Sequence, residues 1–246
     1  MASVWIDGCE WLSRTGIIVG EEGLKRLAGA NVLVVGLGGV GAYAAELVAR
    51  SGVGRMTVID GDTVALSNIN RQLPATSSSV GLLKAEVMAA RLRDINPDIV
   101  LNVVPRYVEA AEMPGIVADG GYDMVIDAID TVAPKVALIA ACKELGVEVV
   151  SSMGAGGRID PSAVRFADIS KTEQCALARV VRRGLRERGI RSGVMTVFSV
   201  EPVPARFVLP VDERNKRSTV GTLSFMPALF GCYLAAYAVR KIAGLW

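Results

Sequence analysis

The sequence of 246 residues contains no histidine. This absence excludes Ser-His-Asp and Cys-His catalysis, metal sites that depend on imidazole ligands, and a histidine general base. Any chemistry that the protein performs must therefore use arginine, lysine, aspartate and backbone groups.

Cysteine is scarce as well. The four thiols, Cys9, Cys142, Cys175 and Cys232, lie far apart and form no C-x-x-C pair. A structural zinc site is therefore not expected, and the spacing supports no disulfide framework. We expect a reducing, cytoplasmic location and interpret Cys175 and Cys232 as packing residues without a catalytic role.

The sequence also lacks the segments that direct proteins into or across membranes. Acidic residues stand at Asp7 and Glu10, where a secretory signal needs a basic segment and then an apolar run. Residues 223–239 are apolar, but they include Pro227 and only just reach the length of a membrane span. We interpret this stretch as a buried or interface helix rather than a membrane anchor.

Charge of one sign does not dominate, because the formal net charge is +2. This value neither supports nor excludes a nucleic-acid partner, since a polyanion binds to local clusters of charge. Hydrophobic residues make up 51% of the chain, which is sufficient for a sizeable core. We therefore expect residues 1–246 to form a single domain.

Short apolar runs alternate with helical periodicities along the chain. The predicted strands span residues 31–36, 55–60, 99–104, 122–127, 147–151, 163–168 and 194–200. The predicted helices span residues 40–51, 81–95, 110–118, 133–145 and 173–188. This order indicates an α/β fold: a Rossmann-like, doubly wound, mostly parallel sheet with a less regular C-terminal extension.

A glycine-rich turn joins the first predicted strand to the first predicted helix. The segment Gly36-Leu37-Gly38-Gly39-Val40-Gly41 satisfies G-x-G-x-x-G in that context, which gives an otherwise weak pattern its meaning. Glycines let the backbone approach phosphate oxygens, and the helix N-terminus favours their charge. Asp60 ends the next strand and is placed to accept hydrogen bonds from ribose hydroxyls. The alternative is a tight turn without a ligand.

The next segment distinguishes ATP from a dinucleotide such as NAD. Arg71 and Lys84 follow the ribose-binding acid. A triphosphate that loses pyrophosphate needs cations where charge accumulates, whereas a dehydrogenase does not. These residues favour ATP, with simple exposure to solvent as the alternative.

Two aspartates, Asp127 and Asp130, end a predicted strand at the edge of the sheet where ligands of open α/β sheets bind. An acidic pair there can hold magnesium against a triphosphate. Either side chain can instead cap the helix that follows.

Together these residues resemble the ubiquitin-activating-enzyme superfamily, the ThiF, MoeB and HesA relatives, whose members adenylate carboxylates. The motifs of the resemblance, which spans most of residues 12–150, are G-x-G-G-x-G, Asp60, Ser67-Asn68-x-Asn70-Arg71, Gly81-x-x-Lys84 and Asp127-x-x-Asp130. It implies that Asp60 binds ribose, that Asn68, Arg71 and Lys84 bind the triphosphate, and that Asp130 binds the magnesium-bound phosphates. The predicted nucleotide site is completed by four further residues: Asp62, Ser67, Asn70 and Asp127.

Arg14 matches an arginine that subunits of this superfamily extend into the partner's site. The resemblance therefore implies a homodimer in which Arg14 joins Arg71, Lys84 and Asp130 as a catalytic residue. Residues 12–150 would bind ATP, and residues 151–246 would bind substrate and form the dimer.

The second half of the chain is similar to one branch, the tRNA threonylcarbamoyladenosine dehydratases. The segments that carry this similarity are residues 154–161 (GAGGRIDP), 168–172 (DISKT), 198–199 (FS) and 221–227 (GTLSFMP). Enzymes of this branch adenylate the carboxylate of the threonylcarbamoyl group, which then closes into a ring with net loss of water. The attacking group lies within the modified base, so no enzyme thiol is required. The glycine turn at 154–157 is also a candidate site for a monovalent cation, bound through its carbonyl groups.

A cluster of arginines agrees with a tRNA substrate. The predicted RNA-binding residues are Arg179, Arg182, Arg183 and Arg186, and two more arginines follow before residue 192. Such a cluster suits an RNA backbone, although a solvated amphipathic helix produces the same pattern.

Two other functions remain open. An adenylyltransferase would activate the C-terminal glycine of a ubiquitin-like sulfur carrier and would have a sulfur-transfer protein partner. The absence of C-x-x-C pairs, and of any cysteine in residues 189–222, argues against this alternative. The second is a Rossmann protein that binds a nucleotide for regulation without chemistry.

Overall fold

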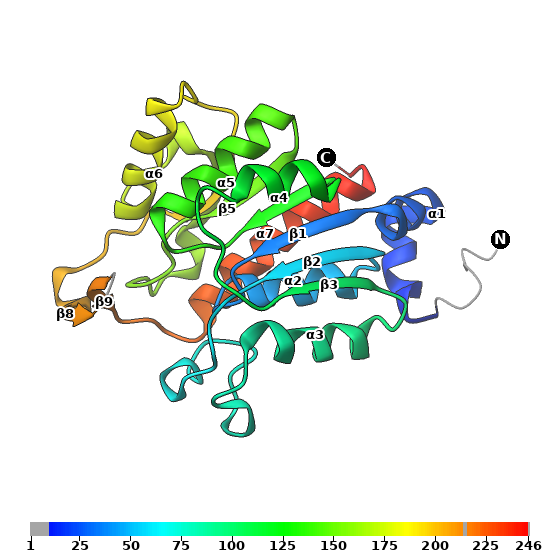
Figure 1. The fold of residues 1–246 in the computed structure, drawn as a ribbon, viewed down its shortest axis with the longest axis horizontal. Helices are drawn as coiled ribbons and strands as arrows, with labels where there is room; N and C mark the ends of the chain where they lie inside the picture. Colours follow the sequence, from blue (N-terminus) through cyan, green and yellow to red (C-terminus); the bar gives the residue numbers. More distant parts are fainter. Residues whose placement is uncertain (1–9, 214–215, 246) are drawn as a thin grey trace.

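The computed structural model describes residues 10–213 and 216–245, which form a seven-stranded sheet with helices on both faces and a separate hairpin (Figure 1). The sheet strands are β1 (Asn31–Val35), β2 (Arg55–Ile59), β3 (Val100–Val104), β4 (Met124–Asp127), β5 (Glu148–Ser152), β6 (Val164–Asp168) and β7 (Met195–Ser199). Their order is β3-β2-β1-β4-β5-β7-β6. All neighbours are parallel except β6, which runs antiparallel to β7. The predicted doubly wound, mostly parallel sheet is confirmed.

The helices divide between the two faces of the sheet. They are α1 (Ser13–Gly29), α2 (Gly41–Arg50), α3 (Lys84–Ile95), α4 (Met113–Gly120), α5 (Val132–Leu145), α6 (Ala176–Glu187) and α7 (Phe225–Ala243). Apolar side chains of α2, α3 and α7 form one core cluster with the sheet, and those of α4, α5 and α6 form the other. Most of the predicted helices begin and end within a few residues of these bounds.

Strand β1 shows why this sheet is covered on both sides. Val32 and Val34 belong to the core under α2 and α7, whereas Leu33 and Val35 belong to the core under α4 and α5. Because successive side chains point to opposite faces, a strand with four consecutive apolar residues, as in residues 32–35, must be buried on both. The parallel register places Val35 beside Ile59 of β2 and Asp127 of β4. The loops that follow these three strands therefore emerge side by side.

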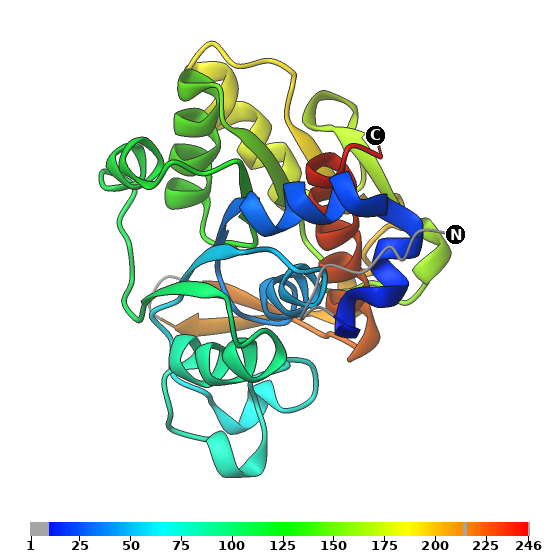
Figure 2. The ribbon, with the colours of Figure 1, turned by 90° about the vertical axis from the view of Figure 1, so that its right-hand side faces the viewer.

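Helices α1 and α7, the first and last helices of the fold, pack against each other (Figure 2). The sequence pattern predicts no helix before residue 31, so α1 was missed. It is kinked at Gly20, whose φ of 69° lies in the left-handed region. The apolar stretch at 223–239 is α7, which buries Phe230 and Leu234 in the core, as the buried-helix prediction requires. Among the described residues, no helix has both the length and the apolar character to cross a membrane.

The antiparallel hairpin of β8 (Val208–Glu213) and β9 (Lys216–Val220) was also missed. It lies at the end of the molecule to which the central parallel strands point (Figure 1). The Gly157 N–H donates to the Gly221 carbonyl at 2.8 Å, which fastens the loop after β5 to the residue that follows β9. The less regular C-terminal extension thus closes over the carboxyl edge of the sheet.

Candidate active site

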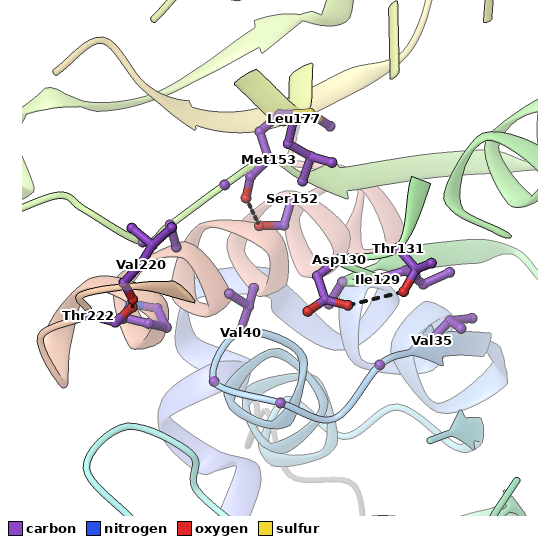
Figure 3. A pocket seen from close by; sticks show the side chains of 18 of the residues that line it. Val35, Val40, Ile129, Asp130, Thr131, Ser152, Met153, Leu177, Val220 and Thr222 are labelled. Carbon is purple, nitrogen blue, oxygen red and sulfur yellow. Dashed lines mark hydrogen bonds between the residues drawn. The ribbon is translucent and has the colours of Figure 1, made fainter. Parts of the chain in front are cut away.

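A cavity of about 820 Å³ opens at the carboxyl edge of the sheet. Its walls come from the loops after β1, β2, β4 and β5, the start of α6, and the β8–β9 hairpin. In Figure 3, Asp130 lies on one side near the loop of Val40, and Val220 and Thr222 form the opposite wall. Its size is in the range of small-molecule and cofactor sites, and its place is the one where open α/β sheets bind ligands.

The glycine turn forms one end of this cavity, where Gly36, Gly38 and Gly39 line it. Gly36 has φ of +90°, and a Cβ there would lie 2.8 Å from the Ala128 carbonyl oxygen. Gly41 does not line the cavity: a Cβ at this position would lie 1.8 Å from the Gly36 carbonyl oxygen. Gly41 is therefore required for the turn itself, and the other three glycines bring the backbone to the cavity wall without a side chain, directly before the N-terminus of α2.

Asp60 is fixed beside this turn. Its Oδ2 accepts a hydrogen bond from the Leu37 N–H at 2.6 Å, and its Oδ1 accepts one from the Asp62 N–H at 2.8 Å. Burial raises the pKa of the Asp60 carboxyl above its usual value, and the two backbone donors oppose this shift. The carboxylate lines the cavity and retains acceptor positions for ribose hydroxyls.

Lys84 enters the cavity from the first turn of α3 with an exposed fraction of 4%. Its Nζ lies 2.7 Å from Asp62 Oδ2, and the Tyr107 hydroxyl donates to Asp62 Oδ1. The hydrogen bond to Asp62 raises the pKa of Tyr107 to about 12. Asp62 thus holds the ammonium group of Lys84 at the cavity wall.

Arg71 also lines the cavity, whereas Ser67, Asn68 and Asn70 do not. The Arg71 Nη1 donates to the Ser67 carbonyl at 3.0 Å and to Asn70 Oδ1 at 2.7 Å. Asn68 Oδ1 accepts from the Ala65 N–H at 3.1 Å and closes the local turn. The Asn70 side chain in turn donates to the Thr222 carbonyl at 3.1 Å. In this chain the three polar residues shape the loop that carries Arg71.

The structure separates the two aspartates that the sequence analysis paired. Asp127 is fully buried: its Oδ2 lies 2.8 Å from Lys135 Nζ and 2.6 Å from Ser151 Oγ, and its Oδ1 accepts from the Ile129 N–H at 3.0 Å. Asp127 does not line the cavity, so the two acids do not face a ligand together. Asp130 is exposed and lines the cavity. The N-cap residue of α5 is Thr131, so the helix-cap alternative does not hold for either aspartate.

Arg14 lies exposed on the first turn of α1 and does not line the cavity of its own chain. Its predicted role in a partner's site stays a prediction.

The arginines of α6 do not form one uniform face. Arg179 lines the cavity, and Arg183 and Arg186 are exposed. Arg182 is half-buried, and its Nη1 donates to the Thr172 carbonyl at 2.7 Å. Because the inner face of the helix is apolar, the exposed arginines form a basic strip that starts at the cavity. Arg182 instead anchors α6 to the preceding loop.

The cysteine predictions have mixed outcomes. Cys175 is buried, lines the cavity, and accepts through Sγ from the Ala178 N–H at 3.4 Å at the start of α6. Cys232 is exposed on α7, so its interpretation as a packing residue was wrong. The apolar helix pattern around position 232 predicted burial, but only the packing of α7 decides which of its faces stays outside.

Several residues in or beneath the cavity are absent from the predicted site, among them Gln72, Tyr107, Lys135 and Arg158. Gln72 directly follows Arg71, and Arg158 lies within the segment 154–161, so their positions in recognised motifs were an available signal. Tyr107 and Lys135 lie in no motif. Lys135 does not line the cavity; its Nζ forms an ion pair with Asp127 and donates to the Ile129 carbonyl beneath it.

Comparisons with known proteins show which family the chain resembles. A model of the ThiF family matches residues 12–245. The tRNA threonylcarbamoyladenosine dehydratase of Haemophilus influenzae is 44% identical over 92% of this chain and 91% of its own length. The crystal structure of the E. coli tRNA N6-threonylcarbamoyladenosine dehydratase in complex with ATP matches with a TM-score of 0.86 at 37% identity, covering 98% of each chain. The E. coli molybdopterin-synthase adenylyltransferase is 38% identical, but over only 59% of this chain and 57% of its own length.

Proposed function

This chain belongs to the ThiF family, and on that basis we propose that it is an ATP-dependent tRNA threonylcarbamoyladenosine dehydratase. It adenylates the carboxylate of the threonylcarbamoyl group on adenosine and closes that group into its cyclic form. The observation that carries the proposal is that one cavity joins the glycine turn to a second compartment, built by the loop after β5, the start of α6 and the hairpin. The similarity to dehydratases extends over 92% of the chain, whereas the similarity to the sulfur-carrier adenylyltransferase covers 59%.

ATP binds with its ribose at Asp60 and its phosphates at the glycine turn and the N-terminus of α2. Arg71 and Lys84 neutralise the charge that develops as pyrophosphate leaves. Because Asp62 fixes Lys84 at 2.7 Å, the ammonium group is held before the nucleotide arrives. Arg14 of a second copy completes the site in a homodimer.

Magnesium fits this site through Asp130. The described residues gather no group of three Asp, Glu or Cys side chains, so a metal there depends on ligand oxygens as well. Magnesium is commonly held by one or two carboxylates together with phosphates, and Asp130 supplies one exposed carboxylate in the cavity. When bound, the ion would neutralise part of the negative charge of the phosphates. A monovalent cation at residues 154–157 is a further part of the proposal.

The reaction has two steps. A carboxylate oxygen of the substrate attacks the α-phosphorus of ATP, an O–P bond forms, and the bond to the β-phosphate oxygen breaks as pyrophosphate departs. A nucleophilic group of the same modified base then attacks the activated carbonyl and releases its proton to solvent, and AMP leaves with the carboxylate oxygen. The ring has lost one water relative to the starting nucleoside. Neither step needs a protein thiol.

The tRNA approaches along the exposed basic strip of α6, which carries Arg179, Arg183 and Arg186 and begins at the cavity. Phosphate contacts there orient the RNA, while the modified base enters the second compartment. We place the enzyme in the cytoplasm, where its tRNA substrate is found.

Mass spectrometry of nucleosides tests the function. Threonylcarbamoyladenosine-containing tRNA is incubated with the protein and magnesium-ATP, then digested under mild conditions that preserve a labile ring. The proposal requires the loss of one water only when ATP is present. If folded, ATP-binding protein leaves the nucleoside unchanged, the proposal is wrong. ATP–pyrophosphate exchange that depends on a protein ending in Gly-Gly would then favour the sulfur-carrier adenylyltransferase and its sulfur-transfer partner, and nucleotide binding without turnover would favour a regulatory role.

A further inference from the structure

Arg158 is a buried cation in the loop after β5, on a different segment of the cavity wall from the glycine turn. Its exposed fraction is 2%, and it lines the cavity. Its Nη2 donates to the Gln174 carbonyl at 2.5 Å, but Nε and Nη1 are buried and have no hydrogen-bond partner among the described residues. A guanidinium is charged at all ordinary pH values, so burying its N–H groups without acceptors is unfavourable.

The other buried cations of the site show that this arrangement is unusual. Lys135 is fully buried with Asp127 at 2.8 Å, and Lys84 is almost fully buried with Asp62 at 2.7 Å. No described carboxylate forms an ion pair with Arg158. Of the three cations, Arg158 alone has no acidic partner within the described residues.

Glu201 is an acid close to Arg158 in the fold, but its carboxylate oxygens accept hydrogen bonds from backbone N–H groups. They accept from the Ile159 N–H at 3.0 and 3.2 Å and from the Asp160 N–H at 3.0 Å. Glu201 therefore fixes the backbone immediately after Arg158 without forming an ion pair with the guanidinium. Burial lowers the pKa of Arg158, and the nearby charge of Glu201 and the Cys175 side chain only oppose this shift. On the other side, Gly157 has φ of +73°, and a Cβ there would lie 2.5 Å from Val203 Cγ1. The backbone that carries Arg158 is held from both directions.

Apolar side chains form part of the cavity wall on the elements next to Arg158. Met153, Ala155, Leu177 and Val220 line the same compartment. In such a medium an anion gains more from a guanidinium than it would in water, because little solvent screens the pair. The cavity therefore combines a buried positive charge, which has no ion-pair partner among the described residues, with a partly apolar lining.

We propose that Arg158 binds the carboxylate of the substrate and holds it in the cavity for adenylation, an inference that rests on the proposed function. The phosphates already have the glycine turn after β1, Arg71 and Lys84, which line the cavity from other segments of the chain. The free N–H groups of Arg158 are left for a second anion, and the carboxylate of the threonylcarbamoyl group is the one that the reaction needs there. One carboxylate oxygen keeps its hydrogen bond to Arg158 while the other attacks the α-phosphorus.

The test compares two ligands and three proteins. The ligands are a synthetic anticodon stem–loop RNA with threonylcarbamoyladenosine and the same RNA with its carboxylate converted to a carboxamide. Wild type, Arg158→Gln and Arg165→Gln are titrated with each RNA in the presence of α,β-methylene-ATP, which prevents turnover. Arg165 is the matched control because it is an exposed arginine on β6 outside the cavity. Separate titrations measure the affinity for the ATP analogue alone.

Wild type and Arg165→Gln should prefer the carboxylate RNA by about 10- to 100-fold, the value expected for hydrogen bonds to a charged group. Arg158→Gln should bind both RNAs with similar affinity and retain the affinity for the ATP analogue within about twofold of wild type. Arg158→Lys should recover part of the preference. If Arg158→Gln does not fold, the titrations are made with Arg158→Met instead, because methionine fills similar space without an unpaired charge.

A carboxylate preference that survives in the folded variant would overturn the proposal. So would a loss of affinity for the ATP analogue with the RNA preference unchanged, because Arg158 would then serve the nucleotide. Turnover of the carboxylate RNA by wild type is measured alongside. Its absence would refute the proposed function itself, whereas turnover combined with an unchanged preference would refute only the role of Arg158.

Discussion

Replacement of Lys135 by methionine removes the charge that neutralises Asp127 beneath the cavity. Both side chains are fully buried, with 2.8 Å between Nζ and Oδ2. The Lys135 ammonium also donates to the Ile129 carbonyl at 2.9 Å, and Asp127 accepts from the Ile129 N–H. The pair therefore fixes the backbone that leads from β4 to Asp130.

The cost of the substitution follows from the charge that remains. Breaking a buried ion pair on one side typically costs about 3–5 kcal/mol. Asp127 keeps the hydrogen bonds from Ser151 and Ile129, and methionine fills most of the lysine volume, so we expect a value near the lower limit. For a chain of this size, about 3 kcal/mol corresponds to a fall in Tm of roughly 6–12 °C. Asp127→Asn combined with Lys135→Met leaves no unpaired charge and should recover much of the loss.

Urea unfolding followed by circular dichroism provides the free energies, and the four proteins form a double-mutant cycle. A loss below 1 kcal/mol in Lys135→Met, or additive losses in the double variant, would refute the reasoning. Turnover adds a second comparison. If Asp127 only positions the loop, Asp127→Asn and Lys135→Met should lower kcat to a similar extent. A far greater loss in Asp127→Asn would instead indicate direct contact of Asp127 with the nucleotide or its metal.

Three further predictions concern the surface of the site. Lys84→Ala should lower turnover by well over tenfold while leaving the fold intact, because it removes charge stabilisation as pyrophosphate leaves; a wild-type rate in a kinetic assay would contradict this. Replacing Arg183 and Arg186 by glutamine should weaken tRNA binding and reduce its salt dependence without changing ATP affinity, and an unchanged slope in salt titrations would remove α6 from the RNA interface. Tyr107 has its pKa raised to about 12, so its hydrogen bond to Asp62 stabilises the fold fully below pH 10 and is lost as pH rises toward 12. The stability difference between wild type and Tyr107→Phe should therefore shrink over that interval in urea titrations, and a constant difference would contradict the assignment.

Local sequence determined the sheet and the phosphate end of the cavity. Apolar runs of strand length and a glycine turn are short-range signals, and parallel strands necessarily bring their carboxyl ends to one edge. Asp60, Arg71, Lys84 and Asp130 consequently line one cavity, as their positions in the sequence suggested. Helix α1 escaped because glycines interrupt it, and the bend at Gly20 breaks the helical period.

Tertiary structure decided which charges are paired. Asp127 and Asp130 are three residues apart and chemically identical, yet one is buried against Lys135 and the other is exposed in the cavity. Arg158 gave no indication in the sequence that it would be buried without an acid. The sequence states which groups carry charge, but the energy of a charge depends on burial and on partners that are distant along the chain. That information exists only once α5, the loop after β5 and the start of α6 have packed around the carboxyl edge of the sheet.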